Sequence, residues 1–327
     1  MKILFWKESG GDVCATLLAE APDVRQCGGA REAVEYCIRR FAEESRLGQL
    51  ALPRVTRMDT QEDGGVEFDF DAAVPPEIEL GQYLGLEVYV PSDEEPDLPV
   101  LRAAAETMQV RIPETYISRK TDALVRRRLE DVAQRTGFVT LADMAAILRT
   151  VSTTLALDCS ESELWDAAVA AADEMSGARL RAHSTEETVA IIAGALYGEG
   201  AEDKEGAIAR ALNRRAEEKQ HTSPEVLAEE CFACYLRMAG KTEKSLREEL
   251  REQAEELVRF DLLIEEVARR EALEVTDDEF NAALETIAAM YDMHPAEVIG
   301  MIGAVSLRDQ LLRDKARAMI VDSAKRI

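Results

Sequence analysis

The stretch ELVRFDLLIEEVARREALEVTDDEF, residues 256–280, decides the fold, because it predicts a long helix whose apolar side is too wide for one packing face. Five apolar residues recur at helical spacing along one stripe of the longer segment 245–273: Leu246, Leu250, Leu257, Ile264 and Val267. Four more widen that stripe: Val258, Phe260, Leu262 and Leu263. A helix this broadly apolar must be buried on several sides or must contact a partner that is not always present.

The composition predicts an acidic, soluble protein. The chain has 327 residues, with 39 Lys and Arg against 64 Asp and Glu, and a net charge of −25. This charge repels phosphate backbones and anionic lipid surfaces, so we expect no direct contact with nucleic acid or membranes. The apolar run MKILFW is too short for a signal peptide, and we find no stretch of about 18 apolar residues. Six Cys spread through a long chain are typical of reduced thiols, which favours a cytoplasmic location.

Residues 1–91 are predicted to form a small α+β domain. In VEFDFDAAV, residues 66–74, apolar and acidic residues alternate as in a strand with one buried face. The segments LPRVTRM and LEVYV are the candidate neighbouring strands. The segment AREAVEYCIRRFAEESR has apolar residues at helical spacing, so we expect a helix lying on a small antiparallel sheet.

The rest of the chain is predicted to be almost entirely helical. Residues 92–99, within PSDEEPDLP, form a predicted acidic linker, because the residue before a proline is disfavoured in a helix. Residues 100–327 follow as a helical domain, with GEGAEDKEG, residues 198–206, as a flexible connection. Its helix start signals are Pro113, Ser160 with Glu163, Ser184 with Glu187, Ser223 before Pro224, Thr276 with Glu279, and His294 before Pro295. The predicted fold class is therefore α+β and predominantly α-helical.

No motif predicts a metal site. Cys231 and Cys234 have the spacing of two metal ligands, but a structural zinc ion needs four. The three histidines lie far apart along the chain: His183, His221 and His294. We therefore interpret the two cysteines as reduced residues packed within a helix.

No motif predicts catalysis or a cofactor either. The sequence Gly240-Lys241-Thr242 is similar to the end of a phosphate-binding loop, but Tyr235 stands where that loop needs its first glycine. No nucleophile, base and oxyanion donor can be assembled, so we expect no enzyme active site. The cluster Arg126, Arg127 and Arg128 fans around a helix, which favours surface ion pairs over a docking patch.

Several segments resemble the trigger factor family of bacterial nascent-chain chaperones. SLREELREQAEELVRFDLLIEEVARREALEVTDDEF, residues 245–280, and RDKARAMIVDSAKRI at the end are similar to its carboxy-terminal domain. IPETYISRKTDALVRRRL from Ile112 and CYLRMAGKTEKSLREEL resemble the two halves of a helical arm. FDFDAAVPPEIELGQYLGLEV, residues 68–88, is similar to the amino-terminal sheet. The resemblance implies an extended multi-helix domain with arm-like helical hairpins.

The departures from the family are equally specific. The chain has no Gly-Phe-Arg-x-Gly-Lys string, which is the family's ribosome-docking core, so ribosome docking is doubtful. It also has no Ile-Pro-Gly-Phe and no Asp-Gly-x-x-Phe, so the FKBP-like prolyl isomerase domain is predicted to be missing. Residues 138–230 have no evident counterpart and are interpreted as a helical insertion.

The resemblance and the wide apolar stripe together predict an ATP-independent holdase. It would bind apolar segments of unfolded, nascent or unassembled proteins in a cradle between helical arms, and the negative charge would favour basic clients. The candidate contact residues are Tyr116, Leu124, Phe260, Phe280, Ile287, Met290, Tyr291, Met301 and Ile302. Methionine is common on surfaces that fit many partners. The alternative hypothesis is a non-catalytic helical scaffold or assembly factor for one specific protein partner.

Overall fold

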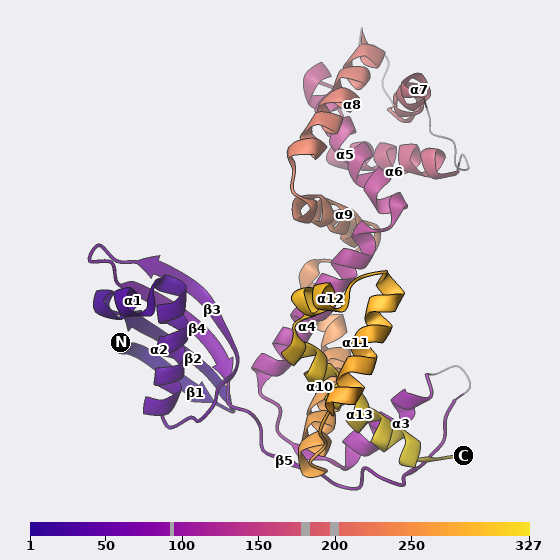
Figure 1. Ribbon diagram of the computed structural model, residues 1–327. Helices are drawn as coiled ribbons and strands as arrows, with labels where there is room; N and C mark the ends of the chain where they lie inside the picture. The colour runs from indigo at the N-terminus through magenta and orange to yellow at the C-terminus, as the bar shows by residue number, and fades with distance from the viewer. Residues whose placement is uncertain (92–94, 178–183, 197–202) are drawn as a thin grey trace. The chain divides into compact units, whose positions relative to one another are not determined.

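The computed structural model describes residues 1–91, 95–177, 184–196 and 203–327 (Figure 1). These residues are mostly helical, with a small sheet near the N-terminus, so the predicted α+β, predominantly α-helical fold class is confirmed. His183 and residues 198–202 of the predicted connection lie outside the described residues.

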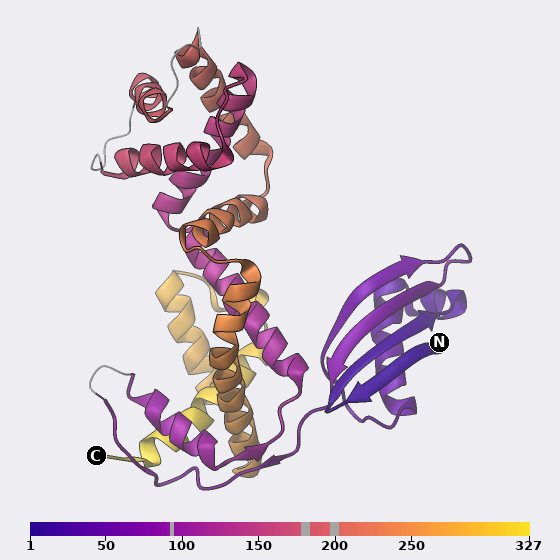
Figure 2. The same ribbon diagram turned by 180° about the vertical axis from the view of Figure 1, so that it is seen from behind.

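The amino-terminal sheet is antiparallel and has the strand order β1-β2-β4-β3. Its strands are β1 (Lys2–Ser9), β2 (Asp12–Ala19), β3 (Ala51–Thr60) and β4 (Val66–Ala73). Helices α1 (Ala21–Cys27) and α2 (Ala30–Glu44) lie on one face of this sheet, as the two opposite views show (Figures 1 and 2). The alternation predicted for residues 66–74 is confirmed, because Val66, Phe68 and Phe70 are buried and Phe70 meets Phe41 of α2 edge to face at 5.6 Å.

The segment LEVYV does not join this sheet, so that prediction was wrong. Pro75 and Pro76 follow β4 directly, and two residues without an N–H donor cannot continue a ladder of strand hydrogen bonds. The chain instead forms β5 (Ile78–Glu79), which pairs with β7 (Gln109–Val110). Strand β6 (Glu87–Val88) pairs in parallel with β8 (Lys325–Arg326) at the carboxy-terminal end.

The predicted linker at residues 92–99 is partly helical. Residues 92–94 lie outside the described residues, but helix α3 (Asp97–Thr107) begins within the predicted range. Pro99 lies in its first turn, where the backbone N–H groups have no partner within the helix and a proline therefore costs no hydrogen bond. The prediction gave these prolines too much weight as helix breakers.

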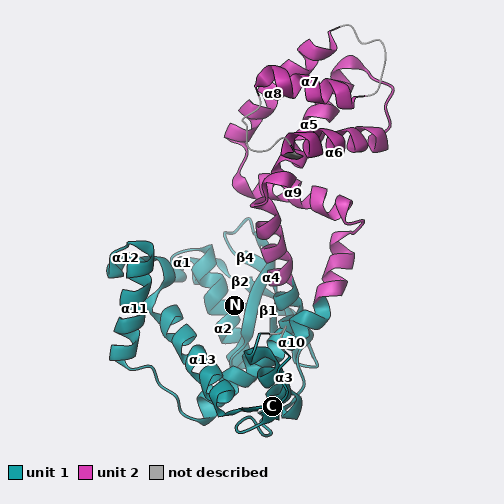
Figure 3. Ribbon diagram, turned by 90° about the vertical axis from the view of Figure 1, so that its right-hand side faces the viewer, with its two compact units in different colours: residues 1–121, 251–327 teal, residues 122–250 magenta. Residues whose placement is uncertain are grey.

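The chain divides into two compact units (Figure 3), which are described separately. Unit 1 comprises residues 1–121 and 251–327, and unit 2 comprises residues 122–250. Helices α4 (Glu114–Ala133) and α10 (Glu243–Arg270) each begin in one unit and end in the other. These boundaries differ from the predicted ones, since the proposed insertion 138–230 is only part of unit 2.

The helical core of unit 1 is built by α3, α10 and α13 (Ala304–Ser323). Leu263 and Val267 of α10 are fully buried there, together with Val100 of α3 and Ile320 of α13. A separate small core joins α11 (Asp277–Tyr291), α12 (Pro295–Ile302) and the start of α13. The wide apolar side of α10 is thus mainly a core surface.

A carboxylate of the amino-terminal sheet caps helix α4 within unit 1. Asp12, at the start of β2, accepts hydrogen bonds from the backbone N–H groups of Glu114 and Thr115 at 3.0 and 2.7 Å. Gly11 precedes it, and a Cβ atom at this position would lie 2.8 Å from the ring of Pro113. The β1–β2 turn therefore needs glycine to reach the start of α4.

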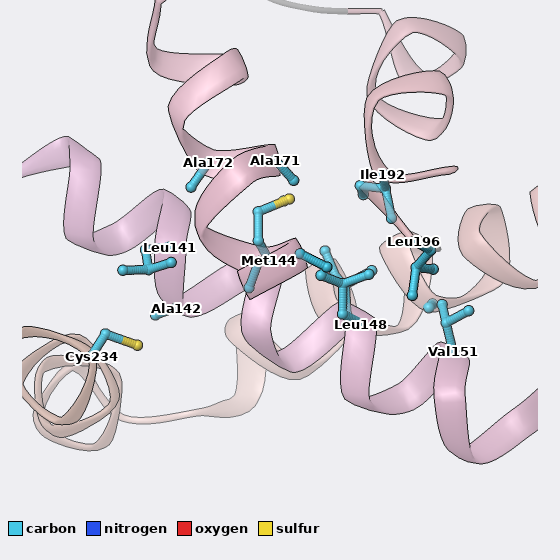
Figure 4. Packing of buried hydrophobic residues seen from close by; sticks show 14 of the residues in the cluster. Leu141, Ala142, Met144, Leu148, Val151, Ala171, Ala172, Ile192, Leu196 and Cys234 are labelled. Atoms are coloured by element: carbon cyan, nitrogen blue, oxygen red, sulfur yellow. The ribbon is translucent and has the colours of Figure 1, made fainter. Parts of the chain in front are cut away.

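Unit 2 is a helical module around α5 (Thr136–Leu155), which packs against α6 (Glu161–Gly177), α8 (Lys204–His221) and α9 (Pro224–Met238). Helix α7 (Thr185–Ala195) packs on α6 and α8. Figure 4 shows side chains of this core, including Met144, Leu148 and Val151 of α5 and Ile192 of α7. Among the described helices, α5 alone is long and apolar enough to cross a membrane, but it is the central core helix of this unit.

Arg215 is the most buried charged side chain described in unit 2, with 7% exposure. Its guanidinium pairs with Asp143 of α5 at 3.1 Å and with Glu230 of α9, while Lys219 pairs with the same Asp143 at 2.8 Å. This network joins α5, α8 and α9 by charge-assisted hydrogen bonds in a poorly solvated place.

We predict that Arg215→Met lowers the free energy of unfolding of unit 2 by about 2 kcal/mol, because it removes the charge-assisted hydrogen bonds of a buried guanidinium to Asp143 and Glu230. Urea denaturation followed by circular dichroism measures the change. The matched control is Arg214→Met, since Arg214 is 70% exposed and pairs with Glu218 along the same helix; it should cost less than about 0.5 kcal/mol. Equal losses for the two variants would contradict a special role for the buried network.

Candidate functional site

Exposed apolar side chains gather on the hairpin formed by α11 and α12 and on the start of α13. Six large apolar residues of this region are exposed: Met290, Tyr291, Ile299, Met301, Ile302 and Val305. Four of them expose more than half of their surface, from 67% at Tyr291 to 75% at Met301. We call these six residues the hairpin patch. Exposed apolar side chains concentrated in one short segment, residues 290–305, indicate a binding surface.

The small core beneath the hairpin patch holds its helices together. Phe280, Leu284 and Ala288 of α11 meet Val298 of α12 and Leu307 of α13. Gly303 joins α12 to α13 with φ at +84°, a backbone conformation that favours glycine. The core is small, and helix α12 has only eight residues, of which Val298 is the one buried. The apolar residues of α12 therefore outnumber the positions at which they can be buried.

Side chains of α13 fix the start of α11. Arg308 donates to the Asp277 carboxylate at 2.6 Å and to the Val275 carbonyl at 3.2 Å, and its guanidinium lies 4.5 Å from the centre of the Phe280 ring. Lys315 donates to Glu279 at 2.7 Å. These contacts hold the start of α11, whereas Met290 and Tyr291 of the hairpin patch lie at its end.

The helix caps follow the predicted start signals. Thr276 accepts from the backbone N–H of Glu279, and the Glu279 carboxylate accepts from the backbone N–H of Thr276. The hydrogen bond from Lys315, with those from Thr276, lowers the pKa of Glu279 to about 2. At α12 the cap is a histidine, since Nδ1 of His294 accepts from the backbone N–H of Ala296 at 3.2 Å.

The segment that carries the hairpin patch is acidic, although Arg308 and Lys315 of α13 pair with two of its carboxylates. Residues 271–307 contain no Lys and no Arg. They contain eight carboxylates: Glu271, Glu274, Asp277, Asp278, Glu279, Glu285, Asp292 and Glu297. An apolar surface with this surrounding favours partners that combine apolar side chains with positive charge.

The structure brings together four of the nine predicted contact residues. Met290, Tyr291, Met301 and Ile302 are all exposed and belong to the hairpin patch. Ile287 is half-buried against the small core. Tyr116 of α4 is half-buried, and Leu124 is half-buried against a cluster within unit 2.

Phe260 and Phe280 are not surface residues. Phe260 is 5% exposed and belongs to the core of α3, α10 and α13, which surrounds α10 on several sides. Phe280 is 7% exposed and lies beneath Arg308. The sequence reasoning selected both by apolar periodicity, which identifies buried stripes as readily as exposed ones.

Sequence reasoning missed other exposed apolar residues. Ile299 and Val305 belong to the hairpin patch but were not selected. In the amino-terminal sheet, the edge strand β1 exposes Leu4, Phe5 and Trp6, and the edge strand β3 exposes Met58. A signal was present in β1, because its run ILFW, residues 3–6, contains four successive apolar residues. Apolar side chains therefore point to both faces of this strand.

The two cysteines with metal-ligand spacing, Cys231 and Cys234, lie on helix α9 of unit 2. Cys231 and Cys234 are buried in the unit 2 core (Figure 4 labels Cys234), which confirms the helix-packed interpretation. Burial raises the pKa of Cys234 to about 11 and also raises that of Cys231. Because metals and electrophiles react with the thiolate form, neither side chain is suited to such chemistry at neutral pH. No cluster of metal-ligating side chains occurs among the described residues.

The Gly-Lys-Thr and Arg clusters are also structural. Gly240 follows α9 with φ at +63°, as in a helix C-terminal cap, and Lys241 pairs with Glu249 at 2.5 Å. Arg126 lies 3.8 Å from Glu130, and Arg128 donates to the Tyr235 hydroxyl at 3.2 Å.

These observations define a class of protein. It is predominantly helical, and it exposes apolar side chains within an acidic segment that includes a short helical hairpin. Its carboxy-terminal region, residues 227–322, matches the family model of the bacterial trigger factor protein carboxy-terminus. The chain is therefore trigger factor-like in the region that carries the hairpin patch. The predicted resemblances at residues 68–88 and 112–129 lie outside that match and stay predictions.

Curated relatives agree with the family match. Trigger factor of Streptococcus mutans is 33% identical over 91 residues, which are 28% of this chain and 21% of that protein. Trigger factor of Clostridioides difficile is 34% identical over 92 residues, which are 27% of this chain and 22% of that protein. The chain thus spans about a fifth of the length of these relatives.

A solved trigger factor structure, from work on promiscuous substrate recognition in its folding and assembly activities, aligns with 98% of this chain and 99% of its own. The identity is 12% and the TM-score is 0.35, so this likeness carries no argument about the fold.

We predict that acid loosens the start of α11 through Glu279. Its lowered pKa means that the carboxylate stabilises the fold above the carboxyl pKa of the unfolded chain, about 4.3, and that this stabilisation is lost as the pH falls through about 2. In Glu279→Gln, the free energy of unfolding should therefore fall less between pH 4.5 and 2 than in the wild type. Denaturant titration at each pH measures this, with Glu285→Gln as a control on the same helix. The same pH dependence in the wild type and in Glu279→Gln would refute the assignment.

Proposed function

We propose that this protein is an ATP-independent chaperone that holds apolar segments of unfolded, nascent or unassembled polypeptides at the hairpin patch. The observation that carries the proposal is the exposure of six apolar side chains on a hairpin within the trigger factor-like region. Two of them are methionines, whose flexible side chains adapt to different partners. A holdase needs weak, adaptable binding of this kind, so that clients can leave again.

The clients that fit best carry Lys or Arg beside apolar residues. Residues 271–307, which include the hairpin, contain eight carboxylates and no Lys or Arg, and the whole chain has a net charge of −25. Unassembled proteins that are basic because they bind nucleic acid have this chemistry. Complementary charge would speed their capture and would weaken with added salt.

The proposal includes no catalysis, and it places the protein in the cytoplasm. No motif for prolyl isomerase activity was found in the sequence, and the ribosome-docking string of the family is missing, so we propose a chaperone that acts without either function. A protease-coupled assay on a proline-containing peptide tests the first point. We expect the rate of cis–trans isomerisation to equal the uncatalysed rate, and a clear acceleration would refute this part of the proposal.

We predict that the double variant Met290→Ser with Met301→Ser loses holdase activity. Each methionine is more than 70% exposed, so the change should leave the fold intact while removing apolar area from the contact. Client affinity should fall about ten-fold. The assay is light scattering of a chemically denatured enzyme diluted into buffer, with stoichiometric chaperone and no nucleotide.

The matched control for this assay is Met238→Ser, because Met238 is 52% exposed but belongs to unit 2. It should suppress aggregation as well as the wild type does. Wild-type protein that leaves aggregation unchanged would refute the holdase proposal, and equal losses in the two variants would refute the location of the site.

A scaffold for one specific partner is the second candidate, and one feature of unit 2 favours it. A cavity of about 410 Å³ opens among α4, α5, α8 and α9, and its lining includes Val139, Ala142, Leu227 and Cys231. It lies mostly in residues 138–230, for which we found no counterpart in the resembled family. A scaffold should bind one folded protein tightly and should not suppress the aggregation of unrelated clients.

A further inference from the structure

The cap of helix α12 differs in chemistry from the other side-chain caps in the described helices. Ser184, Ser223 and Thr276 cap their helices with hydroxyl oxygens, which keep their lone pairs at any ordinary pH. At α12 the acceptor is Nδ1 of His294, 3.2 Å from the backbone nitrogen of Ala296. A ring nitrogen can accept only in the neutral imidazole, with the proton on the other nitrogen.

We propose that His294 is a proton-operated switch for the hairpin patch. The effect of protonation on helix α12 does not depend on the proposed function, whereas its effect on client binding does. Protonation of Nδ1 uses the lone pair that accepts from Ala296, so the cap hydrogen bond is lost and one helix N–H becomes unpaired. It also puts a positive charge at the positive end of the helix dipole. Histidine is the side chain that undergoes this change between about pH 5 and 8.

The helix that depends on this cap is short enough for the cap to matter. Helix α12 has eight residues, Pro295–Ile302, and isolated helices of this length are not stable in water. Val298 is its buried residue, at 2% exposure, so one side chain and the caps hold it. It carries Ile299, Met301 and Ile302, half of the hairpin patch. Loss of the cap therefore weakens the helix that carries half of the client surface.

The charged groups around His294 do not replace the lost hydrogen bond. Glu297, on α12 itself, already accepts from the backbone N–H of His294 at 2.9 Å. The charged groups on the elements that pack against α12 are mainly acidic: Asp277, Asp278, Glu279, Glu285 and Asp292 on or after α11, and Arg308, Asp309, Arg313, Asp314, Lys315, Arg317 and Asp322 on α13. Carboxylates can attract the imidazolium, but the side-chain acceptor that the structure places at the Ala296 N–H is Nδ1 of His294. The switch therefore acts through the lost acceptor.

Hydrogen exchange of the α12 amides tests the switch without any client. After correction for the intrinsic pH dependence of exchange, protection of residues 296–302 in the wild type should fall about five-fold from pH 7.5 to pH 5.5, as the loss of an N-cap predicts. In His294→Asn, asparagine caps at both pH values, so protection should stay constant. His221→Asn, which changes another exposed histidine, should behave as the wild type does. Unchanged wild-type protection, or the same fall in His294→Asn, would overturn the proposal.

Client affinity is the second measurement, with a denatured basic protein as the probe. The wild type should bind it several-fold more weakly at pH 5.5 than at pH 7.5, and His294→Asn should not. If exchange shows the switch but no client binds at either pH, the proposed function fails and the switch stands. If clients bind equally at both pH values in the wild type while α12 loses protection, control of the client surface by His294 is refuted.

Discussion

The burial of helix α10 is the constraint on which the rest of the structure depends. Its apolar side is too wide for one neighbour, and it is divided between two clusters along its length. Leu246 and Leu250 belong to a cluster of unit 2, whereas Leu263 and Val267 belong to the core of unit 1 with α3 and α13. The four residues that widen the stripe are also buried, with exposures of 5% or less: Val258, Phe260, Leu262 and Leu263. The apolar stripe of α10, which was predicted to contribute a binding surface, is therefore mostly part of the core.

The surplus of apolar surface lies where the core is smallest. The cluster beneath the hairpin patch contains five buried residues, and it cannot cover the apolar side chains of α11 and α12. Arg308 and Lys315 hold the start of α11 from α13 by ion pairs, a carbonyl contact and an aromatic contact rather than by burial. This support does not cover Met290 and Met301, which are 71% and 75% exposed. Exposure of the hairpin patch is thus a consequence of how its support is built.

Much of the architecture could be predicted from the sequence, because local signals agreed with the packing. The alternation at residues 66–74 and the cap at Thr276 are both present in the structure. Strands β1 and β2 were both missed. All residues of β1 are exposed and a bulge lies between Ile3 and Phe5, whereas β2 does alternate, with Val13, Ala15, Leu17 and Ala19 buried. The failures at LEVYV and at α3 both involve prolines, whose effect depends on whether the lost N–H would have had a partner. The sequence alone does not show which backbone N–H groups would have had a hydrogen-bond partner at these positions.

The candidate site was half predictable for a similar reason. In α11, Phe280, Leu284 and Ala288 follow one another at every fourth residue and form the buried stripe. Met290 does not continue that stripe, so a helical projection would have separated Phe280 from it. Tyr291 follows Ala288 by three residues and Leu284 by seven, so the projection places it on the buried stripe although it is exposed. For α12 a helical projection does not identify the buried face, because most of its residues are apolar. Val298 is the residue that is buried in the small core. Which apolar residue is buried depends there on the tertiary position of Leu307 and Phe280.

The acidity of residues 271–307, which carry the hairpin patch, resolves an apparent conflict between exposed apolar surface and solubility. Two copies that met through this surface would bring sixteen carboxylates together, eight from each copy, with no Lys or Arg of residues 271–307 between them. Like charges placed opposite each other oppose association, so apolar attraction between copies is weakened. A cationic, unfolded segment meets the opposite condition, because its apolar residues and its charges are both attracted. The same eight carboxylates can thus disfavour self-association and favour basic clients, and neither effect requires a deep pocket or a bound nucleotide.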